Sequence, residues 1–132
     1  MPLRVDQVQI LVVDDVNAVQ VRVRELLCAL GFKEILFASS GTEAKKILTE
    51  KKFDLILSDW HMENGNGVDL LNFVRTNNAL RDTAFVFVTV ENTKERVIEA
   101  IRGGVDDYLV KPLTTAQIET KVASALVKRQ II

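Results

Sequence analysis

The sequence predicts an α/β fold in which a five-stranded parallel sheet is covered by helices on both faces. Short apolar runs rich in β-branched and aromatic residues alternate with longer segments in which apolar residues recur at helical spacing. Strict alternation of strand and helix is typical of parallel sheets, because each parallel connection has to cross a face of the sheet. With 132 residues and no linker-like tract, the chain is expected to form one domain over residues 1–132.

The five apolar runs are predicted to be strands. Each run is too short for a typical helix and apolar on both faces, which predicts strands buried inside the sheet. They cover residues 8–13, 34–38, 54–58, 84–88 and 107–110.

A helix is predicted after each strand. The first apolar stripe spans residues 19–30, and Cys28 is expected to pack into the core as a small apolar residue. Val97, Ile98 and Ile101 form the stripe of the fourth helix. The other stripes lie within residues 44–48, 70–74 and 118–126.

The composition excludes several classes of function. Seventeen basic and eighteen acidic side chains leave a formal charge of -1, which argues against binding to nucleic acid. A single cysteine allows neither an intramolecular disulfide nor a cysteine-based zinc site. The apolar run before Asp14 is too short for a secretory leader or a membrane span. We therefore expect a cytoplasmic protein without nucleic-acid or membrane partners.

Polar residues collect where the predicted strands end. Asp14 and Asp15 follow the first strand, Asp59 the third, Thr89 the fourth and Lys111 the fifth. Ligands of open α/β sheets bind outside the carboxyl ends of the strands, so these side chains are expected to share one rim. Each residue alone has an ordinary explanation as a helix cap, a strand residue or a loop residue. Their occurrence together favours a functional site.

The residue types at this rim are suited to phosphoryl transfer. Carboxylates held close together repel one another or bind a cation, and all-oxygen ligands suit Mg²⁺. A carboxylate such as Asp59 can attack phosphorus and form an aspartyl phosphate. The ammonium of Lys111 and a bound Mg²⁺ would then neutralise the charge on the transferred group.

Four sequence stretches together resemble the receiver domain of two-component response regulators, above all the single-domain chemotaxis type. They are LVVDD (11–15), LSDWHM (57–62) with Gly67 following, FVTVE (87–91) and DDYLVKP (106–112). The resemblance implies a flavodoxin-like, doubly wound (βα)5 fold with strand order 2-1-3-4-5. It also implies a signalling module that catalyses only its own phosphorylation and dephosphorylation.

The resemblance implies roles for the rim residues. Asp59 corresponds to the phosphoacceptor, which would receive its phosphoryl group from a histidine kinase. Mg²⁺ would be held by Asp15 and Asp59 directly, by Asp14 mainly through water, and by the backbone carbonyl of His61. Lys111 corresponds to the lysine that contacts the phosphoryl group.

The resemblance also implies a switch and a partner-binding surface. Thr89 corresponds to the switch hydroxyl and Tyr108 to the switch aromatic, while Pro112 corresponds to a cis proline. Lys94 and Lys121, like Tyr108, match partner-contacting positions. The expected partner is a flagellar motor switch protein or another output protein, and a phosphatase could end the signal.

Two residues depart from the family pattern. Glu63 replaces a usual proline in the loop after Asp59, and Val90 replaces a usual small residue after Thr89. Val90 is expected to narrow access to the phosphoryl site. His61, the single histidine, is expected to be a solvent-facing loop residue rather than a base for hydrolysis.

Other functions remain open at the level of the sequence. The ending KRQII, without an appended DNA-binding segment, favours a stand-alone regulator, but a receiver from a larger response regulator or hybrid kinase would look similar. A flavin-binding electron carrier shares this fold, yet the loop after the first strand is acidic and lacks glycine. An aspartate-dependent phosphatase would need a second acid–base aspartate and a cap domain.

Overall fold

The protein is described by a computed structural model that covers residues 2–62, 66–90 and 92–132. The strands are β1 (Gln9–Val13), β2 (Glu34–Ala38), β3 (Leu55–Ser58), β4 (Ala84–Thr89) and β5 (Asp107–Val110). The helices are α1 (Asn17–Ala29), α2 (Gly41–Glu50), α3 (Gly67–Thr76), α4 (Lys94–Arg102) and α5 (Thr115–Lys128), with a 3-10 helix η1 (Val5–Gln7) before β1. The five predicted strands and five predicted helices are therefore confirmed.

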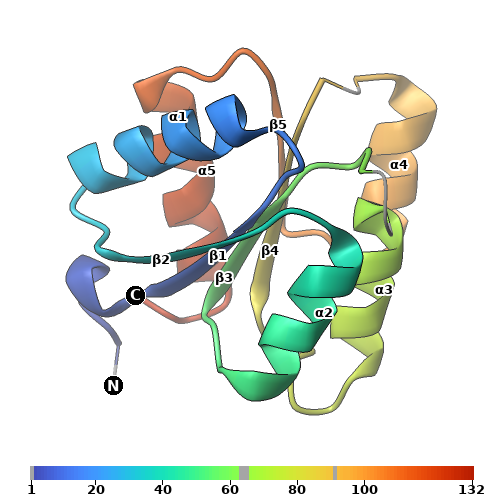
Figure 1. Cartoon of the computed structure of the whole chain (residues 1–132), viewed down its shortest axis with the longest axis horizontal. Coiled ribbons are helices and arrows are strands. Elements are labelled where there is room, and N and C mark those ends of the chain that lie inside the picture. Colours follow the sequence, from blue (N-terminus) through green and yellow to red (C-terminus); the bar gives the residue numbers. More distant parts are fainter. Residues whose placement is uncertain (1, 63–65, 91) are drawn as a thin grey trace.

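The strands form one parallel sheet in the order β2-β1-β3-β4-β5, as expected for a flavodoxin-like fold. Helices α1 and α5 cover one face, and α2, α3 and α4 cover the other (Figure 1). In the register of the central strands, Val13 lies opposite Ser58 and Ser58 opposite Phe87. The strands therefore end close together at one rim.

Alternate residues of the central strands feed two cores. Ile10 and Val12 of β1 pack with the apolar faces of α1 and α5. Leu11 and Val13 point to the opposite face and pack with α2, α3 and Trp60. This alternation follows from the two-residue period of a strand. Residues of β3 divide in the same way, with Leu55 and Leu57 in the first core and Ile56 in the second.

The two edge strands differ from the prediction of fully buried strands. Leu36 of β2 is 42% exposed, and β5 is only partly buried. An edge strand has a neighbour on one side only, so the covering helices overlap it less completely. The apolar runs therefore correctly predicted strands, but the prediction of complete burial was wrong for β2 and β5.

Two further burial predictions were wrong. Cys28 is exposed, because it points away from the buried Leu26 and Leu27, and neighbouring helical residues point about 100° apart. In α4 the buried residue is Ala100, whereas Ile98 and Ile101 are exposed, Ile101 by 62%. The apolar stripe of α4 is therefore surface and not core.

A buried ion network closes the sheet at the end opposite the rim. The Asp106 carboxylate is fully buried and accepts hydrogen bonds from Arg129 Nε (2.9 Å), Arg75 (3.1 Å) and the amide of Phe85 (2.9 Å). Burial, followed by the neighbouring Arg129, lowers the pKa of Arg75. Arg75 also donates to the carbonyl of Gly104, 2.9 Å away. The network joins α3, the connection from α4 to β5, and the end of α5.

None of the helices in the described part of the chain has the length and apolar content needed to cross a bilayer.

Candidate functional site

Backbone hydrogen bonds extend the sheet by one residue at the rim. The amide of Asp59 donates to the carbonyl of Val13 (2.9 Å), and the amide of Lys111 donates to that of Thr89 (2.8 Å). The amide of Asp14 likewise donates to the carbonyl of Ala38 (3.0 Å), so the residues that follow β1, β3 and β5 are held at sheet spacing. Asp14 and Asp59 are both buried there.

The Lys111 ammonium lies between these two buried carboxylates. Its Nζ atom is 2.9 Å from Oδ2 of Asp59 and 2.9 Å from Oδ2 of Asp14. The lysine side chain is 15% exposed. The sequence correctly predicted that these three groups converge, and the structure brings them into direct contact.

The second oxygen of Asp59 is also fixed. Its Oδ1 accepts hydrogen bonds from the amides of Trp60 (2.6 Å) and His61 (3.3 Å). Gly67 makes this turn possible, since its own amide donates to the carbonyl of Trp60 and a Cβ there would collide with the Asp59 carbonyl and the Phe87 ring. Both carboxylate oxygens are therefore oriented before any ligand binds.

Asp14 is held by its own loop and by α1. Its Oδ1 accepts a hydrogen bond from the amide of Val16 at 2.9 Å. The side-chain amide of Gln20 donates to the carbonyl of Asp14 at 2.6 Å. The sequence analysis missed Gln20, because a polar residue on the first turns of a helix carries no pattern that distinguishes it from a solvated one.

The charges at the rim perturb one another. Burial raises the pKa of Asp14, although the hydrogen bonds from Lys111 and from the Val16 amide oppose the shift. For Lys111, burial acts to lower the pKa, but its contacts with Asp59 and Asp14 prevail and raise it. Lys111 is therefore a firmly protonated cation between two acids.

Asp15 lies outside this cluster. Its exposed side chain lines a neighbouring cavity of about 430 Å³ together with His61, Met62 and Asn66. Within the described residues, no three acidic, histidine or cysteine side chains already surround a common metal position. The donor set nevertheless fits a hard cation, since the rim carries three carboxylates against one ammonium and its ligands are oxygens.

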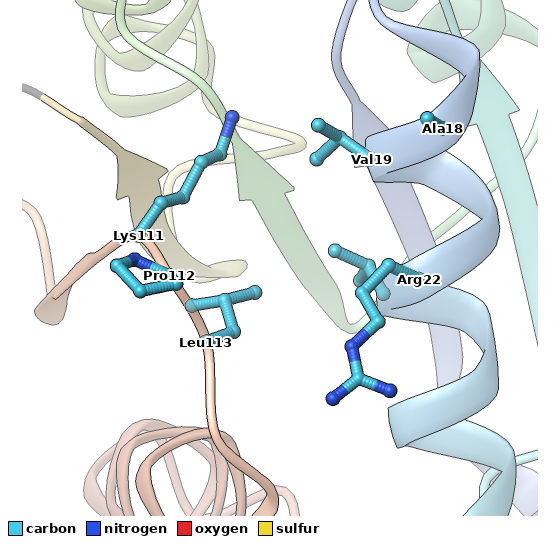
Figure 2. Close-up of a pocket in the computed structure, with 7 residues that line it drawn as sticks. Ala18, Val19, Arg22, Lys111, Pro112 and Leu113 are labelled. Carbon is cyan, nitrogen blue, oxygen red and sulfur yellow. The ribbon is translucent and has the colours of Figure 1, made fainter.

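A second cavity, of about 380 Å³, lies beside the stem of Lys111. Aliphatic side chains of α1 and of the loop after β5 line most of it, and Arg22 faces Leu113 across it (Figure 2). The Lys111 ammonium points away from this cavity, toward the carboxylates of the rim. The mainly aliphatic lining of this cavity is therefore unsuited to a phosphoryl group.

The residues expected to act as a switch lie on β4 and β5. Thr89 is fully buried at the end of β4, and Tyr108 is half-buried on the edge strand β5. The ring of Phe87 packs against Tyr108 (5.9 Å between centroids) and against Trp60 (5.0 Å). Aromatic side chains thus connect the residue after Asp59 to β5. The peptide bond before Pro112 is cis, as the resemblance implies.

Of the two residues that depart from the family pattern, Val90 and Glu63, the structure describes only Val90. Val90 is 67% exposed at the rim, directly after the buried Thr89. Glu63 lies outside the described residues.

A family model, the response regulator receiver domain, matches residues 10–123. The chain belongs to the response regulator receiver family. As a member of this family, the chain is a signalling module of two-component systems. Family membership favours a function in a phosphorelay over that of a flavin-binding electron carrier or a phosphatase.

Similar proteins include chemotaxis regulators. The chain is 36% identical over 114 residues to chemotaxis protein CheY-3 of Vibrio cholerae, covering 86% of this chain and 88% of the relative. It is also 36% identical over 114 residues to chemotaxis protein CheY of Pseudomonas aeruginosa, covering 86% and 92%. Among solved structures, the chemotaxis response regulator CheY4 of Vibrio cholerae superposes with a TM-score of 0.83 at 27% identity, covering 90% of this receiver and 98% of that chain.

Proposed function

We propose that this receiver domain is a phosphorylation-activated switch in which Asp59 accepts a phosphoryl group from the phosphohistidine of a histidine kinase. The observation that carries the proposal is the 2.9 Å contact between Lys111 and Asp59, at the end of the central strand β3. It places a cation where a phosphoryl group on Asp59 would develop negative charge. The fixed orientation of the carboxylate favours attack along one direction.

The proposed transfer needs no nucleophile other than Asp59. A carboxylate oxygen attacks phosphorus, a P–O bond forms, and the P–N bond of phosphohistidine breaks with its electron pair going to the imidazole, which takes up a proton. In the second half of the cycle, water attacks phosphorus and the P–O bond to Asp59 breaks, which releases inorganic phosphate and returns the electron pair to the carboxylate. Lys111 stays within reach of the phosphoryl oxygens in both steps.

Three carboxylates and one carbonyl would hold Mg²⁺ in this proposal. Asp15 and Asp59 would bind the ion directly, Asp14 mainly through water, and His61 through its backbone carbonyl. The ion supplies positive charge that offsets the charge of the phosphoryl oxygens. The exposed position of Asp15 beside an open cavity is consistent with this role.

Phosphorylation would be transmitted through Thr89 and Tyr108. The modification adds about -1.5 to -2 charges beside the buried hydroxyl of Thr89. Movement of that hydroxyl toward the phosphoryl group would vacate space next to β5, into which Tyr108 would turn. Such a change would bias a surface made of α4, β5 and α5 between two arrangements.

The α4–β5–α5 surface would be the partner-binding site of this switch. Ile98 and Ile101 expose apolar area on α4, next to the exposed Lys94. Lys121 of α5 pairs with Asp107 at 3.1 Å, so a partner that contacts this lysine has to compete with an existing ion pair. The exposed Ile98 and Ile101 beside Lys94 would suit an acidic, amphipathic segment of an output protein.

The similarity to chemotaxis regulators suggests what that output protein is. We propose a flagellar motor switch protein as the partner, with a phosphatase ending the signal. The protein would work in the cytoplasm as a single receiver domain over residues 1–132. It would act on no substrate other than its own phosphoryl group.

Treatment with acetyl phosphate and Mg²⁺ tests the proposal. Intact-mass analysis should show one added phosphoryl group that hydroxylamine removes. Asp59→Asn should abolish the addition, whereas the control Asp82→Asn, an exposed residue at the far end of the sheet, should leave it unchanged. Full phosphorylation of Asp59→Asn would contradict the assignment.

A further inference from the structure

One side chain of α4 reaches back to the residue that follows Asp59. The guanidinium carbon of Arg96, in the first turn of α4, lies 5.6 Å from the centroid of the Trp60 ring. Glu99, one turn later, holds the same guanidinium at 3.2 Å. The negative face of an indole ring attracts a guanidinium. Arg96 therefore connects the first half of α4 to Trp60.

The first half of α4 is otherwise lightly anchored. The buried residue of this helix is Ala100, in its second half, and Val97 is half-buried. Lys94 and Glu95 are exposed. Because little apolar area fixes the beginning of the helix, a single contact there has a large share in setting its position.

Trp60 contacts the phosphorylation site as directly as it contacts Arg96. Its amide donates to Oδ1 of Asp59 at 2.6 Å, and its ring packs on Phe87. A phosphoryl group on Asp59 changes the acceptor that the Trp60 amide meets. Trp60 thus lies between the group that is modified and the helix that has to respond.

We propose that Arg96 is a positioning residue of the switch, which holds the first half of α4 against Trp60 while Asp59 is unphosphorylated. The proposal rests on the proposed function and adds a route from Asp59 to α4 besides the one through Thr89 and Tyr108. A cation–π contact whose cation is partly exposed, as that of Arg96 is, shifts a conformational equilibrium by about two- to fivefold. A shift of that size favours the resting position of α4 while Asp59 is unphosphorylated. New contacts at the phosphoryl group are strong enough to reverse this preference.

The proposal is tested first on the unphosphorylated full chain, by hydrogen exchange of the α4 amides and by Trp60 fluorescence. Arg96→Met should raise the exchange of the hydrogen-bonded amides of Arg96 and Val97 by about two- to fivefold and shift the emission of Trp60. Arg96→Lys, which keeps a cation, should restore part of both signals. Arg102→Met, which removes an exposed cation from the same helix, should match the wild type. Wild-type exchange in Arg96→Met would overturn the proposal.

The second arm repeats the comparison after phosphorylation with acetyl phosphate and Mg²⁺, with the added mass checked in each sample. The change in α4 exchange on phosphorylation should be smaller in Arg96→Met than in the wild type, because the variant has already lost the resting contact. An equal change in both would make Arg96 a structural contact only and overturn the proposal. Absence of the added mass from every sample would contradict the proposed function instead, and with it the transmission from Asp59.

Discussion

The Nζ atom of Lys111 lies 2.9 Å from Oδ2 of Asp59, on the residue that follows the central strand. The same atom contacts Asp14 at an equal distance, so one ammonium serves two buried carboxylates. This arrangement leaves the acidic rim with more negative than positive charge, and it makes the stability of the rim depend on pH and on cations.

Replacement of Lys111 should destabilise the protein. Lys111→Met leaves Asp14 and Asp59 buried without their cation, and an unpaired buried polar group costs about 1–3 kcal/mol. The loss should be greatest near neutral pH and smaller near pH 3, where Asp14, whose pKa is raised by burial, is protonated in the folded and the unfolded state. Urea denaturation across this range measures it. Lys111→Arg keeps the charge and should lose less, and equal stability of Lys111→Met and wild type at pH 7 would contradict the prediction.

Asp14 gives a pH dependence of known sign. In the folded protein the pKa of Asp14 is raised above its usual value of 3.8. Between pH 3.8 and the raised pKa, the folded state therefore binds more protons than the unfolded state. In this window its contribution to stability falls with increasing pH. Asp14→Asn lacks this contribution, so the variant should gain stability relative to the wild type across the window and then keep a constant difference. Denaturation curves of both proteins from pH 3 to pH 7 test this, and a difference that shrinks with pH would refute it.

Magnesium should stabilise the wild-type protein and depend on Asp15 to do so. A cation that binds only the folded state at 100 times its Kd adds about 2.7 kcal/mol. Asp15→Asn should reduce this gain, while its effect without metal should stay within about 0.5 kcal/mol because the side chain is exposed. Melting curves with and without Mg²⁺ measure both effects. Asp82→Asn should respond to Mg²⁺ like the wild type, and a full response in Asp15→Asn would rule out this residue as a ligand.

Val90 should slow access to Asp59. Valine is stiff at χ1, and its side chain is exposed at the rim beside Thr89. Val90→Ala should therefore speed both phosphorylation by acetyl phosphate and release of phosphate, with stability within about 0.5 kcal/mol of the wild type. Trp60 fluorescence and a phosphate-release assay give the two rates. The control Val127→Ala, an exposed valine of α5, should leave the rates unchanged. Unchanged rates in Val90→Ala would mean that its bulk does not gate the site.

The sequence was sufficient to predict the fold and the convergence of the rim because both follow from simple periodicities. Apolar runs identified the strands, and parallel strands necessarily bring the residues after them to one edge. Asp14, Asp59 and Lys111 could therefore be placed together without coordinates. The contact distances could not be predicted, since they depend on side-chain rotamers. For the same reason, the sequence could not predict that the Asp15 side chain is exposed.

The remaining differences arise where tertiary context overrides a local pattern. Ile98 and Ile101 have the spacing of a buried stripe, but α4 covers the region near an edge of the sheet and buries only Ala100. Gln20 and Arg96 act through long polar side chains, whose targets are distant in the sequence. No periodicity marks such residues, and only the assembled structure identifies their partners.

The network around Asp106 has a mechanical consequence for the response. Arg75 ties down the carbonyl of Gly104, just beyond the last turn of α4, and Asp106 anchors the start of β5 in the same way. The far end of α4 is therefore pinned, while its near end rests on Arg96. A helix that is fixed at one end can rotate about that end but cannot translate along its axis. We accordingly expect any displacement of α4 to be a swing about Gly104, with the largest excursion at Lys94, where a partner would meet it.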